Sequence, residues 1–127
     1  MKIYFATIFI ILNSAFGLCQ TAEFNFKGKT TVKWDKTKEG ELLSHYFIYQ
    51  NTGSVPLIIE DAKVACPCTK VIFPKNPTLP GATDSILVTF DTAGKYYYQD
   101  RTIQLIANTG KSEKLRFKVY VIPKEEE

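Results

Sequence analysis

The stretch that decides the fold is Lys114-Leu115-Arg116-Phe117-Lys118-Val119-Tyr120-Val121, near the end of the 127-residue chain. Its apolar odd-numbered residues alternate with charged or amphipathic ones, and this period of two predicts a strand with one buried and one exposed face. A similar alternation fills 102–107, and Asn108-Thr109-Gly110-Lys111 between the two segments has the composition of a reversal. The two segments are therefore expected to form an antiparallel hairpin.

The rest of the chain shows the same kind of pattern. Alternating apolar residues occupy 43–49 and 85–90, an extended stretch is expected at 55–64, and one or two opening strands at 24–34. Turn sequences rich in Gly, Pro, Asn and Asp separate these segments. No window repeats apolar residues at helical spacing over three turns. The sequence predicts an all-β, Ig-like antiparallel β-sandwich of about seven strands, with a small barrel as the alternative architecture.

The N-terminus has the features of a secretory signal. A lysine at position 2 precedes the uncharged apolar run Ile3–Leu12, and small residues follow it. This run is far shorter than the roughly 20 residues that cross a bilayer. We predict a cleaved signal peptide at 1–19, a domain at 20–122 and a charged tail at 123–127. Cleavage after Cys19 is favoured over cleavage after Gly17.

A lipid anchor on Cys19 is the alternative to simple cleavage. Leu18 argues against it, because lipoprotein processing favours a small residue just before the cysteine. A mature protein that starts at Gln20 would exclude the anchor. Either route predicts export to the periplasm, the cell surface or the extracellular space.

Charge argues against binding to nucleic acid. The chain has 16 basic and 13 acidic residues, and removal of residues 1–19 leaves 15 and 13, a net charge of +2. The basic residues are scattered among acids and form no long block, so a basic face has no compositional support. No second apolar segment of membrane length follows residue 19. We therefore expect no nucleic-acid partner and no membrane span.

Several motifs occur in an order that resembles the bacterial Domain of Unknown Function 1573 family. The resemblance covers about residues 24–122 and implies a secreted Ig-like sandwich akin to the MSP and ASH groups, with no catalytic residues to carry over. One departure is Gly94-Lys95-Tyr96-Tyr97-Tyr98, where such proteins often have a Gly/Pro-rich stretch. The matching motifs are Lys38-Glu39-Gly40-Glu41, His45-Tyr46-Phe47, Asn51-Thr52-Gly53-Ser54-Val55-Pro56-Leu57-Ile58-Ile59, Cys66-Pro67-Cys68-Thr69, Leu79-Pro80-Gly81 and Val88-Thr89-Phe90-Asp91-Thr92.

Cys66-Pro67-Cys68 is the only chemically distinctive motif of the mature chain. A disulfide needs Cα atoms within about 7 Å, which residues i and i+2 of a strand satisfy only if the strand bends. We favour a structural disulfide in a bent strand, or failing that two packed thiols. The alternatives are thiol exchange, with Lys63 or Lys70 stabilising a thiolate, and capture of Cu(I). Zinc is weakly supported because a closed site needs four ligands, and we expect no cofactor.

Two other features bear on function. His45 lies on the apolar face of its predicted strand, and catalysis would require it to reach Cys66 or Cys68. Nothing in the sequence brings them together, so we predict no enzyme. The run Tyr96, Tyr97 and Tyr98 has two open interpretations. It forms an exposed contact surface, or Tyr97 joins the core while its neighbours cover an edge.

Other residues with functional associations are interpreted as structural. Trp34 is expected to be a core anchor, and Asn51-Thr52-Gly53-Ser54 and Leu79-Pro80-Gly81 are expected to be turns. The sequence thus favours a non-catalytic exported interaction or structural module, whose partner is an envelope protein or a second copy. A periplasmic thiol-redox or Cu(I)-binding protein that uses Cys66 and Cys68 is the alternative.

Overall fold

The computed structural model describes residues 20–124, and all of its regular structure is strand. The predicted signal peptide with Cys19 and the last three residues of the predicted tail lie outside this range. No helix in the described part of the chain is long and apolar enough to cross a membrane. The strands are β1 (Phe24–Phe26), β2 (Thr31–Lys33), β3 (Thr37–Lys38), β4 (Leu42–Asn51), β5 (Ile59–Val64), β6 (Thr69–Ile72), β7 (Thr83–Asp91), β8 (Tyr97–Ala107) and β9 (Glu113–Ile122).

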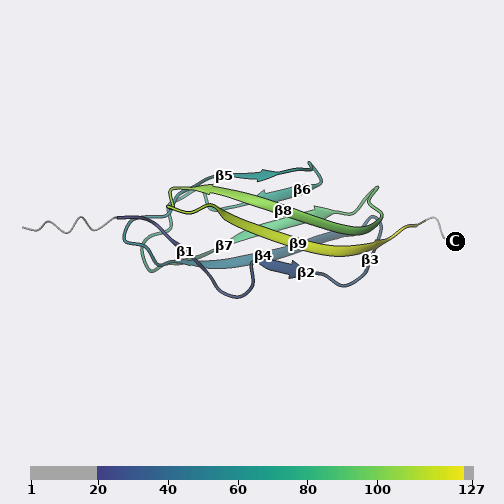
Figure 1. Ribbon diagram of the computed structural model, residues 1–127, viewed down its shortest axis with the longest axis horizontal. Helices are drawn as coiled ribbons and strands as arrows, with labels where there is room; N and C mark the ends of the chain where they lie inside the picture. Colours follow the sequence, from purple (N-terminus) through teal and green to yellow (C-terminus); the bar gives the residue numbers. More distant parts are fainter. Residues whose placement is uncertain (1–19, 125–127) are drawn as a thin grey trace, which may run out of the picture.

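The strands form two sheets that pack face to face (Figure 1). One has the order β1-β4-β7-β6, and the other has the order β2-β9-β8-β5 with β3 also paired to β9. This is the strand order of a seven-strand Ig domain in which β1, β2 and β3 together take the place of the first strand. The chain leaves one sheet after β1 and joins the other at β2. The predicted all-β Ig-like sandwich is confirmed.

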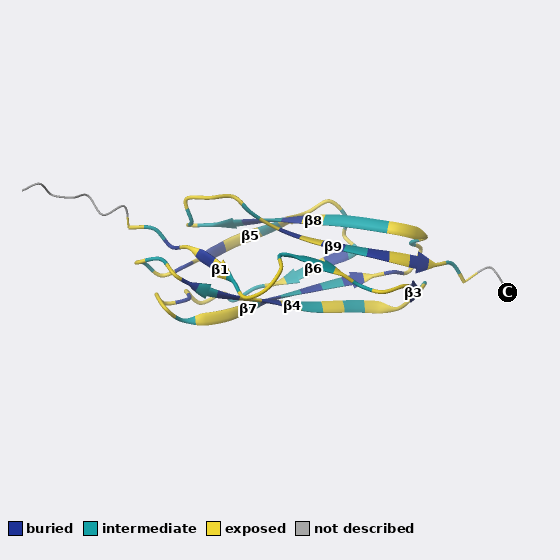
Figure 2. Cartoon of the chain, turned by 60° about the horizontal axis from the view of Figure 1, so that its bottom comes forward, coloured by how far each residue is buried: buried dark blue, intermediate teal, exposed yellow. Residues whose placement is uncertain are grey.

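The core lies between the sheets and is supplied by the alternation that the sequence displays. Leu115, Phe117, Val119 and Val121 of β9 are all buried, as are Ile86, Val88 and Phe90 of β7 on the opposite sheet. Figure 2 shows this alternation as dark and light bands along the strands. The rings of Phe90 and Phe117 meet at 4.9 Å, and Trp34 packs on Phe117 at 5.0 Å. Trp34 is therefore a core anchor, as predicted.

Four local features differ from what the sequence predicts. The stretch 55–64 becomes a strand only at Ile59, because Leu57 forms an isolated bridge with Thr78 in a loop instead. Strand β6, at Thr69–Ile72, was not expected, and β2 and β3 pair with β9 in parallel rather than antiparallel. The cysteine pair lies in the turn between β5 and β6 rather than within a bent strand. Pro67 suits this turn, because it lacks the N–H that a ladder would need.

Candidate functional site

Four tyrosines gather on the surface where β8 begins and β9 ends. Tyr96, Tyr97 and Tyr98 are 49%, 53% and 61% exposed, and Tyr120 is 39% exposed. Tyr98 lies opposite Tyr120 in the ladder between β8 and β9, and the rings of Tyr97 and Tyr120 are 6.2 Å apart. We call these four residues the tyrosine cluster. The interpretation in which Tyr97 joins the core is wrong.

The backbone at Tyr97 is unusual. Its φ is +66°, and it is the only residue other than glycine with a positive φ in the described range 20–124. A left-handed conformation costs a residue with a side chain about 1–2 kcal/mol relative to the usual regions. Strain of this kind often accompanies function. The chain thus holds a large aromatic side chain at the surface in a conformation that suits glycine better.

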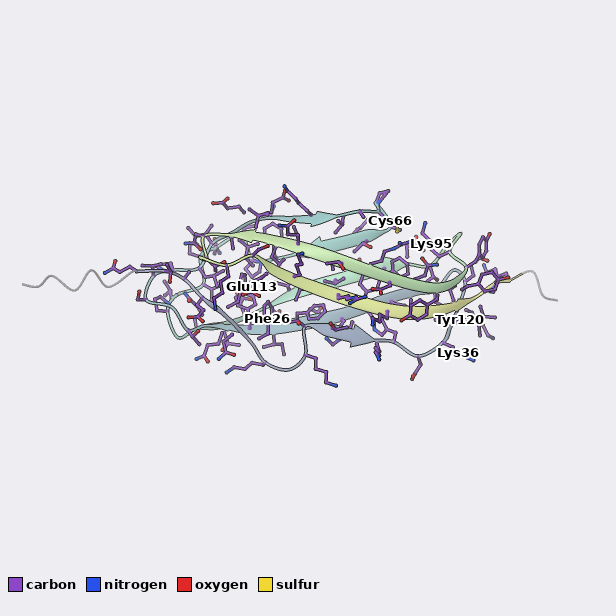
Figure 3. The ribbon with its side chains drawn as sticks, viewed as in Figure 1. Phe26, Lys36, Cys66, Lys95, Glu113 and Tyr120 are labelled. Atoms are coloured by element: carbon purple, nitrogen blue, oxygen red, sulfur yellow. A yellow bond between two sulfur atoms is a disulfide. The ribbon has the colours of Figure 1, made fainter. Side chains whose placement is uncertain are left out.

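Charged groups border the tyrosine cluster on the outer face of β8 and β9. The ammonium of Lys36 lies 5.6 Å from the centre of the Tyr120 ring, within reach of a cation–π interaction. The Arg116 guanidinium donates two hydrogen bonds to Asp100, at 2.7 and 2.5 Å, and these bonds lower the pKa of the Asp100 carboxyl. Figure 3 shows Tyr120 and Lys36 close together towards the end of the sandwich. Aromatic, cationic and hydrogen-bonding groups are thus presented together, as in many protein interfaces.

The second candidate site is the cysteine pair. The sulfur atoms of Cys66 and Cys68 lie at bonding distance, 2.10 Å apart, and their Cα atoms are 5.2 Å apart. The Cys68 N–H also donates to the Cys66 sulfur at 3.4 Å. Both residues are partly exposed at the point where the chain passes from one sheet to the other.

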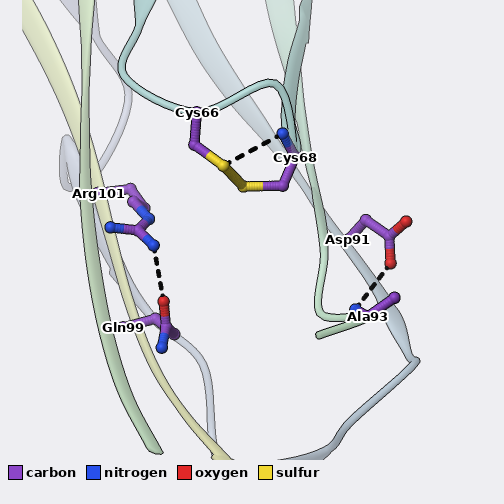
Figure 4. The surroundings of a disulfide bond; sticks show 6 residues. All are labelled: Cys66, Cys68, Asp91, Ala93, Gln99 and Arg101. Carbon is purple, nitrogen blue, oxygen red and sulfur yellow. Dashed lines mark hydrogen bonds between the residues drawn. A yellow bond between two sulfur atoms is a disulfide. The ribbon is translucent and has the colours of Figure 1, made fainter. Parts of the chain in front are cut away.

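Arg101 of strand β8 lies near the cysteine pair (Figure 4). The ladder between β5 and β8 ends where Val64 lies opposite Ile103, two residues along the chain from Cys66 on one side and from Arg101 on the other. Figure 4 shows Arg101 beside the disulfide, with its guanidinium donating to Gln99 at 2.8 Å. The Nε atom of Arg101 is buried and has no hydrogen-bond partner among residues 20–124.

The sequence pattern pointed to Lys63 and Lys70 as partners for a thiolate, and not to Arg101. Both lysines are exposed. The signal was present, because Arg101 has the same parity as the buried Ile103 and Leu105 and must therefore point between the sheets. A cation placed there can stabilise a thiolate if the disulfide opens.

His45 is not part of the cysteine site. It lies on β4 with its ring against that of Phe47, 4.7 Å away. In its sheet, β7 lies between β4 and β6. The cysteine pair directly precedes β6 in the chain. The structure therefore does not bring His45 and the cysteines together. No group of three side chains able to hold a metal ion occurs in the described range.

The order of the motifs and the Ig-like strand arrangement agree with a family assignment. The family model described as "Protein of unknown function (DUF1573)" matches residues 24–121. This chain belongs to the DUF1573 family. The match covers every strand of both sheets except for the last residue of β9. A comparison of the sequence with curated proteins found no match.

Solved structures share the fold of this DUF1573 domain. A protein of unknown function from Porphyromonas gingivalis W83 has 17% identity and a TM-score of 0.69, over 84% of this chain and 50% of that one. The chain thus spans about half of that protein. An ASH/PapD-like domain of human CEP192 has 12% identity and a TM-score of 0.59, over 85% and 88%. The Vibrio cholerae VesB protease has 16% identity and a TM-score of 0.57, over 78% and 31%. Identities this low establish the fold alone.

Proposed function

We propose that this protein is a non-catalytic, exported interaction module of the bacterial cell envelope that contacts its partner through the tyrosine cluster. The observation that carries the proposal is the exposure of all four tyrosines on one part of the surface. Tyrosines offer rigid contact area with little conformational entropy to lose, and they are enriched at binding hot spots. The strained backbone of Tyr97 supports a role in contact, since folding alone would favour glycine at that position.

Export is the second part of the proposal. The charged start, the short apolar run and the small residues before position 20 support it. Near the start of the described range, the Thr21 carbonyl accepts a hydrogen bond from the Ser54 N–H at 3.0 Å. Cleavage after Cys19 would leave this contact in place.

The tyrosine cluster is tested by Tyr97→Gly and Tyr98→Ala. Tyr97→Gly is expected to leave the free energy of unfolding unchanged or to raise it by about 1 kcal/mol, because it relieves the positive φ. Both variants are expected to weaken partner capture by about tenfold or more, as loss of a hot-spot tyrosine does. Capture is measured by photo-crosslinking of the full chain in the cells that produce it, with self-association measured by sedimentation of the purified protein.

Leu79→Ala is the matched control for the tyrosine variants. Leu79 is 62% exposed, close to the 61% of Tyr98, and it precedes β7 at the opposite end of the sandwich. We expect it to bind its partner as the natural chain does. Equal capture by all three variants would show that the contact surface lies elsewhere and would contradict the proposal.

The position of Arg101 favours a second candidate function, reversible thiol–disulfide exchange at Cys66 and Cys68. A disulfide that closes a loop of three residues stabilises the fold by only about 1.6 kcal/mol in the chain-entropy model, so a purely structural role brings little benefit. In the first step of thiol–disulfide exchange, a thiolate of a partner dithiol attacks one sulfur of the Cys66–Cys68 disulfide and forms a mixed disulfide. The partner's second thiol then attacks the mixed disulfide and forms a disulfide within the partner. Cys66 and Cys68 are both released as thiols.

Exchange predicts that the protein recovered from the envelope is a mixture of oxidised and reduced forms, which intact mass distinguishes by two hydrogens. In the reduced protein, we expect Arg101→Gln to slow the reaction of the thiols with a disulfide reagent, because a cation that favours the thiolate is lost. Arg116→Gln is the control, since Arg116 pairs with Asp100 on the outer face. Fully oxidised protein that resists reduction would exclude exchange, and tight Cu(I) binding in a titration would favour metal capture instead. The intact mass of the recovered protein also shows whether the mature chain starts at Gln20.

A further inference from the structure

Half of strand β4 lacks a neighbour on one side. Strand β7 pairs with β4 along Leu42–Gln50, whereas β1 pairs only with Tyr49–Asn51 on the other side. Among residues 20–124, no strand continues β1 alongside the first half of β4, because the chain crosses there to the other sheet. Figure 2 shows the effect on burial, since this half of β4 has no buried residue. The first half of β4 is therefore an open sheet edge.

The register identifies which backbone groups face the open side. The Lys27 N–H donates to the Ile48 carbonyl at 2.8 Å, so the backbone groups of Ile48 point towards β1. Backbone groups of alternate residues point to the same side of a strand. Tyr46 and Ser44 therefore direct their N–H and C=O groups away from β7, and no ladder of the described strands includes those groups on that side. An extended peptide could form hydrogen bonds with both residues.

A groove of about 750 Å³ lies along this edge, between β4 of one sheet and β2 of the other. Its apolar lining includes Phe26, Val32 and Phe47, and Phe26 is labelled in Figure 3 beside the start of β2. The space accommodates the side chains of one face of an added strand. The edge thus offers backbone partners and an apolar floor, the two requirements of strand addition.

The charge of the groove selects its occupant. Lys27, Lys29 and Lys33 are among its lining residues, and none of the lining residues within 20–124 is an aspartate or glutamate. Lys27 donates to the Gln50 side chain and has no acidic partner in the described part of the chain. Three cations beside an apolar floor complement a segment in which acidic residues alternate with apolar ones.

We propose that the open edge of β4 binds an acidic, extended segment of another protein as an added antiparallel or parallel strand. The apolar side chains of that segment enter the groove, and its carboxylates meet the three lysines. Its backbone pairs with Ser44 and Tyr46. This site is separate from the tyrosine cluster, so it goes beyond the proposed function and each can fail without the other.

A synthetic peptide of about seven residues, alternating glutamate and valine, tests the proposal with the isotope-labelled full chain. On binding, hydrogen exchange of the Ser44 and Tyr46 amides is expected to slow, because both N–H groups gain carbonyl partners. Tyr46→Pro removes one of these N–H groups and leaves the ladder with β7 intact, since proline is tolerated at an open edge. We expect it to bind the peptide about tenfold more weakly than Tyr46→Ala, which keeps the N–H.

Charge reversal provides a second variant that does not touch β4. Lys27→Glu/Lys29→Glu/Lys33→Glu is expected to weaken binding of the glutamate–valine peptide by about tenfold or more and to favour a lysine–valine peptide of the same length. Equal binding of both peptides to the natural chain would overturn the proposal, as would slowed exchange at β5 or β6 instead of β4. A short single-stranded DNA that bound as well as the peptide, and bound Tyr46→Pro and Tyr46→Ala equally, would show a simple anion site and would also overturn it.

Discussion

At pH 7, Asn51→Asp is expected to lower the free energy of unfolding by about 4 kcal/mol, because a carboxylate cannot make the hydrogen bonds of the buried amide. The Asn51 side chain donates to the carbonyls of Val55 and Thr78 at 2.8 and 2.9 Å. It also accepts from the N–H groups of Glu23 and Gly53 at 3.2 and 2.9 Å. Asn51 is 0% exposed, so water cannot replace the lost donors. One amide thus joins the start of β1, the following turn and the loop before β7.

The loss caused by Asn51→Asp should depend on pH in a defined direction. Burial raises the pKa of the introduced carboxyl above the value of about 3.9 that it has in the unfolded chain. Below that value the group is neutral in both states and can still donate one hydrogen bond. As the pH rises, the introduced carboxyl loses its proton at a lower pH in the unfolded chain than in the folded one. The free energy of unfolding of the variant therefore falls from about pH 4 upwards. Urea unfolding at a series of pH values measures this dependence.

Asn108→Asp is the matched control for this prediction. The Asn108 side chain also bridges two backbone groups, accepting from the Ile58 N–H at 2.8 Å and donating to the Pro56 carbonyl at 2.9 Å, but it is exposed. Water can compensate its lost donor, so we expect a loss of about 1 kcal/mol with little pH dependence. Equal losses at the two positions would contradict the role assigned to the buried amide.

The fold could be predicted from the sequence where burial alternates over long strands. Leu115 to Val121 and Ile86 to Phe90 each supply one clear buried face, and a hairpin between 102–107 and the last strand follows from the turn at 108–111. The parallel partners of β9 could not be predicted, because β2 and β3 have three and two residues and show no period. Their place depends on where the chain crosses between sheets.

The candidate sites were predicted less well, for reasons that depend on tertiary structure. The exposure of Tyr97 follows from a positive φ that no sequence pattern shows. The groove along β4 exists because β1 ends after Phe26, and neither segment alone indicates it. A turn was expected at Asn51, yet the bond from its amide to Thr78 spans 27 residues of the chain. Local patterns indicate a turn and leave such distant partners undetermined.

Gly53→Ala is expected to lower the free energy of unfolding by about 3 kcal/mol, because the added methyl group has no space. A Cβ at this position would lie 2.2 Å from the Thr21 carbonyl oxygen, 2.6 Å from the Ala22 Cα and 2.7 Å from the Glu23 nitrogen. These are backbone atoms, which cannot rotate away as a flexible side chain could. The first segment of the chain must therefore move away from the turn.

This movement should break two hydrogen bonds between the turn and the first segment of the chain, in addition to lowering the free energy of unfolding. The Thr52 N–H donates to the Glu23 carbonyl and the Ser54 N–H to the Thr21 carbonyl, both at 3.0 Å. In Gly53→Ala, hydrogen exchange at these two amides is expected to accelerate more than exchange in β8 and β9.

Gly110→Ala isolates the clash from the general effect of replacing a glycine. Gly110 lies in the turn before β9, has no positive φ, and an added Cβ would meet no atom within 4 Å. We expect the free energy of unfolding of Gly110→Ala to stay within about 0.5 kcal/mol of that of the natural chain. A Gly53→Ala variant as stable as Gly110→Ala would show that the first segment does not pack against this turn, and β1 would then have to be anchored by its ladder with β4 alone.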